Sequence, residues 1–168
     1  MEKKVKLIGL ISIVAIVLAC GLLAIPQFIV PHDYPSLGSI SGYQFFFHAV
    51  GDNYANNAHF DGVSGLGITS IVLMALALVS YLFSVKSSAF LMLGGIFNVA
   101  TSILYFAMEA SKKRRYAYPD FVNVGWVSYV VGALLVLTGL LSIYFAFRSM
   151  QKEKKEIATK KSYSYIKK

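Results

Sequence analysis

Four long apolar runs, none of which contains Lys or Arg, limit what this chain can fold into. They extend over residues 7–30, 63–85, 89–110 and 121–147. A helix needs about 20 apolar residues to cross the roughly 30 Å hydrocarbon core of a bilayer. Lipid offers no hydrogen-bond partners, so the backbone of each run must satisfy itself internally, which favours helices over isolated strands. The sequence therefore predicts an all-α membrane protein built as a bundle of four transmembrane helices.

Composition agrees with a membrane protein and excludes several classes of function. Of the 168 residues, 57% are hydrophobic and 14% are charged, whereas soluble domains have about 45–50% and about 25%. The net charge is +8, but the basic residues gather beside the apolar runs, and no soluble domain remains to carry a nucleic-acid interface. We therefore expect the lipid bilayer, and not nucleic acid, as the partner. The single cysteine, Cys20, excludes an intrachain disulfide.

The runs divide the chain into a transmembrane domain over residues 1–150 and a basic tail over 151–168. The short link between the second and third runs predicts a tight antiparallel hairpin. The loop over 31–62 contains Ser41 and Gln44 at capping-box spacing, which predicts a short helix over 42–50 lying in the membrane interface. We expect Asp120 to cap the fourth helix. The tail is expected to be helical at its start and disordered beyond.

Basic residues predict the orientation of the helices. Twelve fall on one side of a four-span arrangement: Lys3, Lys4, Lys6, Lys86, Arg148, Lys152, Lys154, Lys155, Lys160, Lys161, Lys167 and Lys168. The other side has four, Lys112, Lys113, Arg114 and Arg115. The positive-inside rule then predicts a multi-pass protein of the cell membrane with both termini in the cytoplasm. The cluster over 112–115 opposes this orientation, and a three-span arrangement is the alternative.

The three-span alternative would follow from cleavage of the first run as a signal. Val17-Leu18-Ala19-Cys20 loosely resembles a bacterial lipobox, in which the cysteine becomes lipidated. The apolar run continues ten residues beyond Cys20, however, and a signal segment would end there. The sequence favours a retained first helix with an ordinary cysteine.

Polar residues follow one face of the third run. Asn98, Ser102, Tyr105 and Glu109 are spaced four, three and four apart, and Thr101 lies beside them. In lipid such a stripe should face protein or water. Hydrogen bonding within the bundle is the favoured interpretation, and a pathway for a solute is the alternative.

Small residues predict where helices pack closely. In the fourth run Ser128 and Gly132 form a small-xxx-small pair, and Gly139 lies seven residues further on the same face. Such positions let two backbones approach one another. They do not distinguish packing within one chain from packing between copies.

Residues that carry chemistry are scarce. His32, Asp33, His48, Asp52, His59 and Asp61 lie in the outer loop, but their spacing matches no metal-ligand pattern. No phosphate-binding loop, nucleophile elbow or paired cysteines occur. We therefore expect no enzyme, no cofactor and no metal site.

The organisation resembles that of two groups of proteins. Four helices, a large first outer loop, a tight inner turn and a basic tail resemble claudin-type tetraspans, but residues 31–62 lack the Trp and Cys residues that claudins have in this loop. The Lys-rich start, Pro26 and the Ser41-Gly42-Tyr43 segment are more similar to small uncharacterised bacterial four-helix integral membrane proteins. These resemblances imply a fold and a location. We expect a structural or accessory protein that packs with itself or with membrane partners. The alternatives are a pore or transporter subunit and, last, a lipid-acting enzyme that uses the loop His and Asp residues.

Overall fold

The structure, a computed structural model, describes residues 2–29, 39–41, 43, 65–107 and 123–166. Its elements, in chain order, are α1 (Glu2–Leu22), β1 (Pro26–Ile29), β2 (Ser39–Ser41), α3 (Gly65–Phe83), α4 (Ser88–Phe106), β3 (Asn123–Val124) and α6 (Trp126–Ile166). Within these residues four helices are long and apolar enough to cross a membrane. The four-helix bundle predicted from the apolar runs is confirmed, and the chain is a membrane protein.

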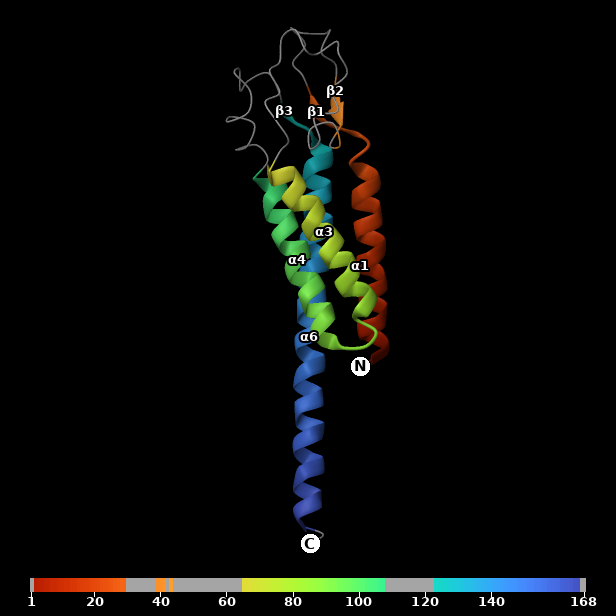
Figure 1. The fold of residues 1–168 in the computed structure, drawn as a ribbon, viewed down its shortest axis with the longest axis vertical. Helices are drawn as coiled ribbons and strands as arrows, with labels where there is room; N and C mark the ends of the chain where they lie inside the picture. The colour runs from red at the N-terminus through yellow and green to blue at the C-terminus, as the bar shows by residue number, and fades with distance from the viewer. Residues whose placement is uncertain (1, 30–38, 42, 44–64, 108–122, 167–168) are drawn as a thin grey trace.

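The four helices lie side by side, with the N-terminus and the α3–α4 turn at the same end (Figure 1). Helix α6 packs against α4 and α1, while α3 packs against α4. The buried side of α6 repeats every three or four residues, as at Val127, Val131, Leu135 and Ala146, which is the period of a helix with one packed face. The opposite faces present large apolar side chains such as Leu137 and Leu140, as lipid contact requires.

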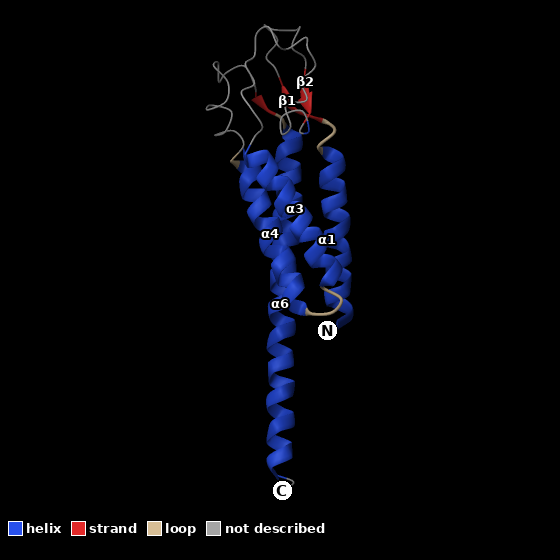
Figure 2. Ribbon diagram, viewed as in Figure 1, coloured by secondary structure: helices blue, strands red, loops and turns tan. Residues whose placement is uncertain are grey.

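A small antiparallel sheet stands at the other end of the bundle, and the sequence interpretation did not include it (Figure 2). The strand order is β2-β1-β3, with Phe28 opposite both Ile40 and Val124. The sheet therefore joins the segment after α1 to the segment just before α6. The backbone amide of Tyr43 also donates to the carbonyl oxygen of Leu23 at 3.2 Å, which ties the loop to the end of α1.

The predicted bounds of the first and fourth helices are wrong. The first helix was expected over 7–30 but extends over Glu2–Leu22, because Pro26 has no amide hydrogen to continue it and favours an extended residue before it. The remaining apolar residues form β1. The fourth run was expected to be helical from residue 121, but Asn123 and Val124 form β3, and α6 begins at Trp126.

Helix α6 also extends further than expected. It continues to Ile166, so the prediction that the tail is disordered beyond its start is wrong. At 1.5 Å per residue its 41 residues measure about 62 Å, roughly twice the hydrocarbon thickness of a bilayer. In Figure 1 its C-terminal half extends beyond the other helices. The expected helix over 42–50, the Asp120 cap and the 112–115 cluster lie outside the described residues, apart from Tyr43.

Candidate functional site

The structure places the predicted polar stripe on the packed side of α4. Asn98 and Thr101 have no exposed surface, and Ser102 and Tyr105 are each 1% exposed. Glu109 lies outside the described residues. The four described members therefore face protein, which is one of the two environments that the sequence allowed.

Two members of the stripe satisfy their hydroxyl groups within α4 itself. Thr101 Oγ1 donates to the carbonyl oxygen of Phe97 at 2.9 Å, and Ser102 Oγ donates to that of Val99 at 2.8 Å. A hydroxyl has one hydrogen to donate, and here it is used on the preceding turn of the helix. These side chains offer no donor to a solute.

Asn98 forms the polar link between α4 and α6. Its Nδ2 donates to Thr138 Oγ1 at 3.3 Å. Thr138 in turn donates to the carbonyl oxygen of Leu134 at 2.8 Å, so its hydroxyl accepts from one helix and donates within the other. The Oδ1 of Asn98 is buried and has no hydrogen-bond partner among the described residues. The packing of α4 against α6 does not explain why this acceptor is buried.

A second buried polar contact joins α1 and α6. Ser142 Oγ donates to the carbonyl oxygen of Thr138 at 2.8 Å, and Ser12 Oγ lies 3.0 Å from Ser142 Oγ. Because the Ser142 hydrogen is already used, Ser12 is the donor in that contact. Together with the Asn98–Thr138 pair, this contact links both α1 and α4 to α6 through polar side chains.

The predicted small residues lie where helices touch. Ser128 is 1% exposed, and a Cβ added to Gly132 would lie 3.0 Å from the Phe106 ring. A Cβ added to Gly139 would lie 2.9 Å from the carbonyl oxygen of Gly95. All three therefore pack within the chain, and Gly139 meets Gly95 of α4.

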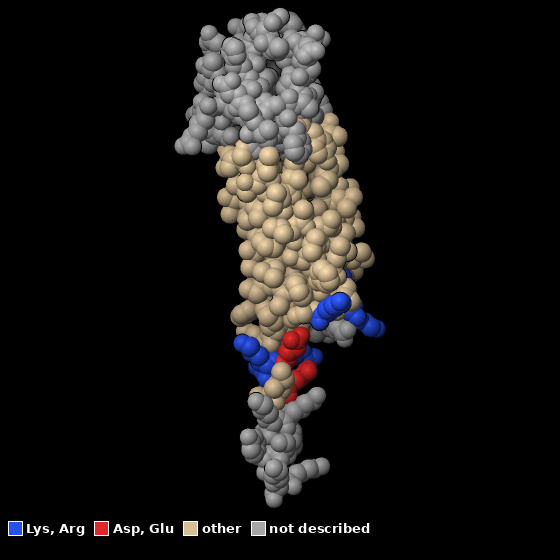
Figure 3. All heavy atoms as spheres, in the orientation of Figure 1, with Lys and Arg blue, Asp and Glu red and all other residues tan. Residues whose placement is uncertain are grey.

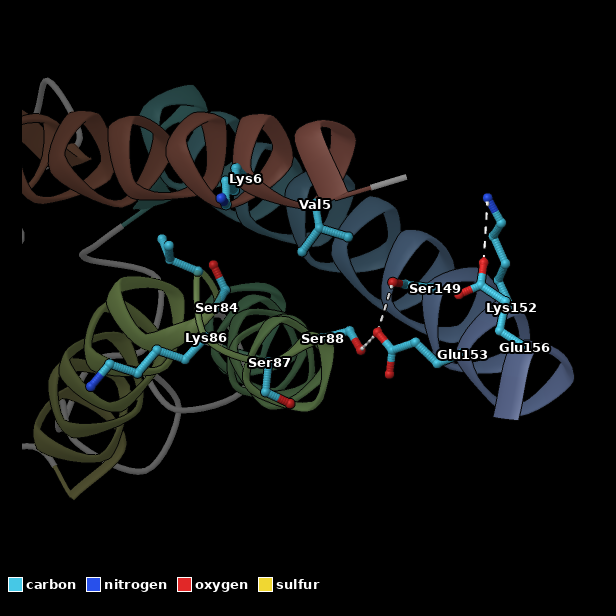
Figure 4. A pocket seen from close by; sticks show the side chains of 11 residues that line it. Val5, Lys6, Ser84, Lys86, Ser87, Ser88, Ser149, Lys152, Glu153 and Glu156 are labelled. Carbon is cyan, nitrogen blue, oxygen red and sulfur yellow. Dashed lines mark hydrogen bonds and ion pairs between the residues drawn. The ribbon is translucent and has the colours of Figure 1, made fainter. Parts of the chain in front are cut away.

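The end of the bundle opposite the sheet has a polar pocket of about 410 Å³ (Figure 4), which the sequence did not predict. Its walls come from the start of α1, the α3–α4 turn and α6. Glu153 accepts hydrogen bonds from Ser88 Oγ and Ser149 Oγ, each at 3.4 Å. Ser88 and Glu153 are 65 residues apart, so no local pattern indicated the contact.

Towards the sheet, the α1–α3 interface has an apolar groove of about 240 Å³. The residues that line it include Ile16, Cys20, Ile71 and Met74. Tyr43 closes one side, and its hydroxyl donates to the carbonyl oxygen of Cys20 at 2.9 Å. Burial, followed by the nearby Cys20, raises the pKa of the Tyr43 phenol above its ordinary value of 10.0. Tyr43 is thus a neutral donor throughout the physiological range.

No group of three His, Cys, Asp or Glu side chains among the described residues is placed to hold a metal ion. The His and Asp residues considered in the outer loop lie outside those residues. No protein-family model, curated protein or solved structure matches the chain. The functional inferences below therefore rest on the residues and their geometry.

Proposed function

We propose that the protein is a non-enzymatic structural or accessory component of the cell membrane that packs with itself or with other membrane proteins. The observation that carries this proposal is the tight α4–α6 interface. There a Cβ on Gly95 would lie 2.7 Å from the carbonyl oxygen of Gly139. Two backbones that meet this closely leave no space between them for a solute, and they bury the stripe that was the best candidate for a pathway.

The projecting half of α6 supports an accessory function. Residues 151–159 are all exposed along this helix, and Ile157 is a large apolar side chain among them. The ion pair between Lys152 Nζ and Glu156 Oε1, 3.9 Å apart, is the i,i+4 arrangement that supports an exposed helix. A helix that extends beyond its own bundle offers a surface to a partner without requiring catalytic residues.

The proposed orientation places both termini in the cytoplasm. Lys and Arg residues gather at the end of the bundle where the N-terminus lies, and the face between the two ends is free of described charges (Figure 3). That distribution supports the positive-inside assignment. With Cys20 replaced by Ala, a cysteine at Asn56 should label with an impermeant reagent in intact cells, and one at Lys154 should not. Labelling of the cysteine at position 154 alone would show that the protein has the opposite orientation.

The resemblance to claudin-type tetraspans and to small bacterial four-helix proteins remains part of this proposal. Its support is the arrangement of four helices with a tight α3–α4 turn at the end where the chain begins. This resemblance does not imply an activity.

A pore or transporter subunit is the second candidate, and the buried Asn98 Oδ1 favours it. An acceptor without a partner inside a membrane protein is a site where water or a cation can bind. Reconstitution in vesicles separates the two candidates. We expect ion and small-solute flux no greater than in protein-free vesicles. Flux that Asn98→Leu abolishes, while far-UV circular dichroism stays unchanged, would establish the pore instead.

A further inference from the structure

The apolar groove between α1 and α3 opens towards the lipid that surrounds the bundle. Its floor consists of almost fully buried side chains, namely Ile16, Leu23 and Met74. Its rim consists of half-buried or exposed side chains, namely Cys20, Ile71, Ala75 and Leu78. Because burial decreases from the floor to the rim, the space faces outward. Val17 and Val72, which follow floor and rim residues in the chain, are exposed apolar side chains of the kind that contact lipid.

The lining of the groove favours an uncharged, apolar occupant. None of the described residues that line it is charged, in contrast to the pocket in Figure 4 at the other end of the bundle. The Tyr43 hydroxyl already donates its one hydrogen to the carbonyl oxygen of Cys20. A polar ligand would therefore lose its hydration without gaining hydrogen bonds. Apolar cavities of about 150 Å³ stay dry and bind apolar molecules, and this groove has about 240 Å³.

The groove lies within one half of the membrane-spanning part of the bundle. Helix α1 ends at Leu22 beside the sheet, so Leu23 marks the sheet-side end of the groove, and Ile16 lies seven positions earlier. At 1.5 Å per residue this is about 10 Å along the helix, whereas one leaflet has about 15 Å of hydrocarbon. The groove therefore extends along most of the leaflet on the sheet side.

The width of the groove excludes a helix as its occupant. A volume of about 240 Å³ over a length of about 10 Å gives a cross-section of about 24 Å². A helix with its side chains is about 10–12 Å across, which is several times too wide. A single hydrocarbon chain is the shape that fits this space, and a bilayer supplies such chains at this depth.

Tyr43 holds the sheet-side end of the groove in place. Its amide donates to the carbonyl oxygen of Leu23 at 3.2 Å, and its hydroxyl donates to that of Cys20 at 2.9 Å. Both its backbone and its side chain are therefore held on the last turn of α1. The ring lies at the level where a bilayer favours aromatic side chains. Because this wall is already in position, an occupant does not have to order it on binding.

We propose that the groove binds one acyl chain of a phospholipid from the leaflet on the sheet side. Moving the chain from lipid into the groove brings no hydrophobic gain, because lipid tails are as apolar as the lining. The gain comes from van der Waals contacts with the floor residues, which an empty groove would leave without partner atoms. The chain, and not the headgroup, is the recognised part of the lipid. The proposal does not depend on which side of the membrane is cytoplasmic.

The test is photo-cross-linking of the full chain in phosphatidylcholine vesicles. A small fraction of the lipid carries a diazirine midway along one acyl chain, and mass spectrometry of the digested protein locates the linked residues. Val130 and Ala133 are the reference, because they are exposed on α6 within its first eight residues at the sheet end. We expect the yield at the groove residues of α1 and α3 to exceed the yield at this reference about fivefold.

Ala75→Leu fills the groove from its rim, since Ala75 lines the space and is exposed. We expect it to lower the yield at Ile16 to Leu23 about fivefold. Ala133→Leu is the matched control, because it makes the same change on a lipid-facing position of α6 and should leave that yield unchanged. Far-UV circular dichroism verifies the fold, and Cys20→Leu replaces Ala75→Leu if that variant fails to fold.

Three results would overturn the site. The first is a groove yield no higher than that at Val130 and Ala133. The second is an Ala75→Leu effect no larger than that of Ala133→Leu. The third is efficient oxidation of Cys20 to a disulfide that joins two chains in the same vesicles, because it would show that a second copy covers the groove.

Discussion

The α4–α6 and α1–α3 interfaces pack by different means within one bundle. Between α4 and α6, Gly95 and Gly139 bring two backbones together, and the Asn98–Thr138 hydrogen bond closes beside them. Between α1 and α3, a close approach occurs at Gly9, where an added Cβ would lie 2.5 Å from Ser84 Oγ. Towards the sheet this second interface opens into the groove beside Ile16 and Ile71.

The difference shows what holds helices together when lipid surrounds them. Apolar side chains gain little from burial in a membrane, since lipid tails are equally apolar, so close packing and hydrogen bonds must supply the stability. The α4–α6 interface has both along its length. The α1–α3 interface has a close contact at one end, at Gly9, and opens into the apolar groove at the other. We therefore expect α4–α6 to be the rigid part and α1–α3 to tolerate substitution.

The largest expected effect comes from filling the glycine contact. Gly95→Leu should destabilise the bundle by at least about 3 kcal/mol, because its Cβ would meet the carbonyl oxygen of Gly139, which no side-chain rotation can move. Gly21→Leu on α1 is the control, since nothing lies within 4 Å of its added Cβ. Titration with a denaturing detergent, followed by far-UV circular dichroism, measures both. Equal losses in the two variants would contradict the rigid assignment of α4–α6.

Removing one partner of the Asn98–Thr138 hydrogen bond should destabilise the bundle more than removing the other. Thr138→Val leaves the buried Asn98 amide without an acceptor and should cost about 1–2 kcal/mol. Asn98→Leu should cost less than about 1 kcal/mol, because Thr138 keeps its own backbone acceptor and the unpartnered Oδ1 disappears. The same detergent titration measures the difference. If Asn98→Leu proved the more costly variant, Oδ1 would have a partner that this explanation omits.

The smallest expected effect lies in the α1–α3 groove. Ala75 is exposed and lines the groove, so Ala75→Leu should change stability by less than about 0.5 kcal/mol. Ala77, two residues away on α3, is fully buried, and Ala77→Leu should cost about 1–3 kcal/mol by overpacking. A large loss in Ala75→Leu alone would show that the groove is as tightly specified as the glycine contact.

Sequence reasoning predicted the parts of the fold that local patterns determine. The length of the apolar runs predicted four spans, and the short link around Lys86 predicted the α3–α4 hairpin. The extent of the first helix was wrong, because Phe28 and Ile29 are apolar in either conformation and hydrophobicity alone does not separate a buried strand from a helix. Their pairing with β3 depends on Val124, which lies far along the chain.

The same limit explains which site residues could be predicted. The spacing of Asn98, Ser102 and Tyr105 placed them on one face of α4 without a structure. The partner of Asn98, Thr138, could not be identified, because the register between two helices is set by where Gly95 and Gly139 meet. The hydrogen bond between Ser88 and Glu153 could not be predicted from local patterns either, because the two residues are 65 positions apart in the sequence.

The aqueous reactivity of a cysteine at position 98 tests most directly whether the polar stripe packs or lines a pathway. In a background with Cys20→Ala, single cysteines at 98 and 102 are compared with one at the lipid-facing Ile103, which is 60% exposed, and one at Lys154 in the projecting helix. We predict that a charged thiol reagent labels position 154 quickly and the other three at equally slow rates. Fast labelling at 98 and 102, with position 103 still slow, would contradict the packed interface and establish a water-filled path along α4.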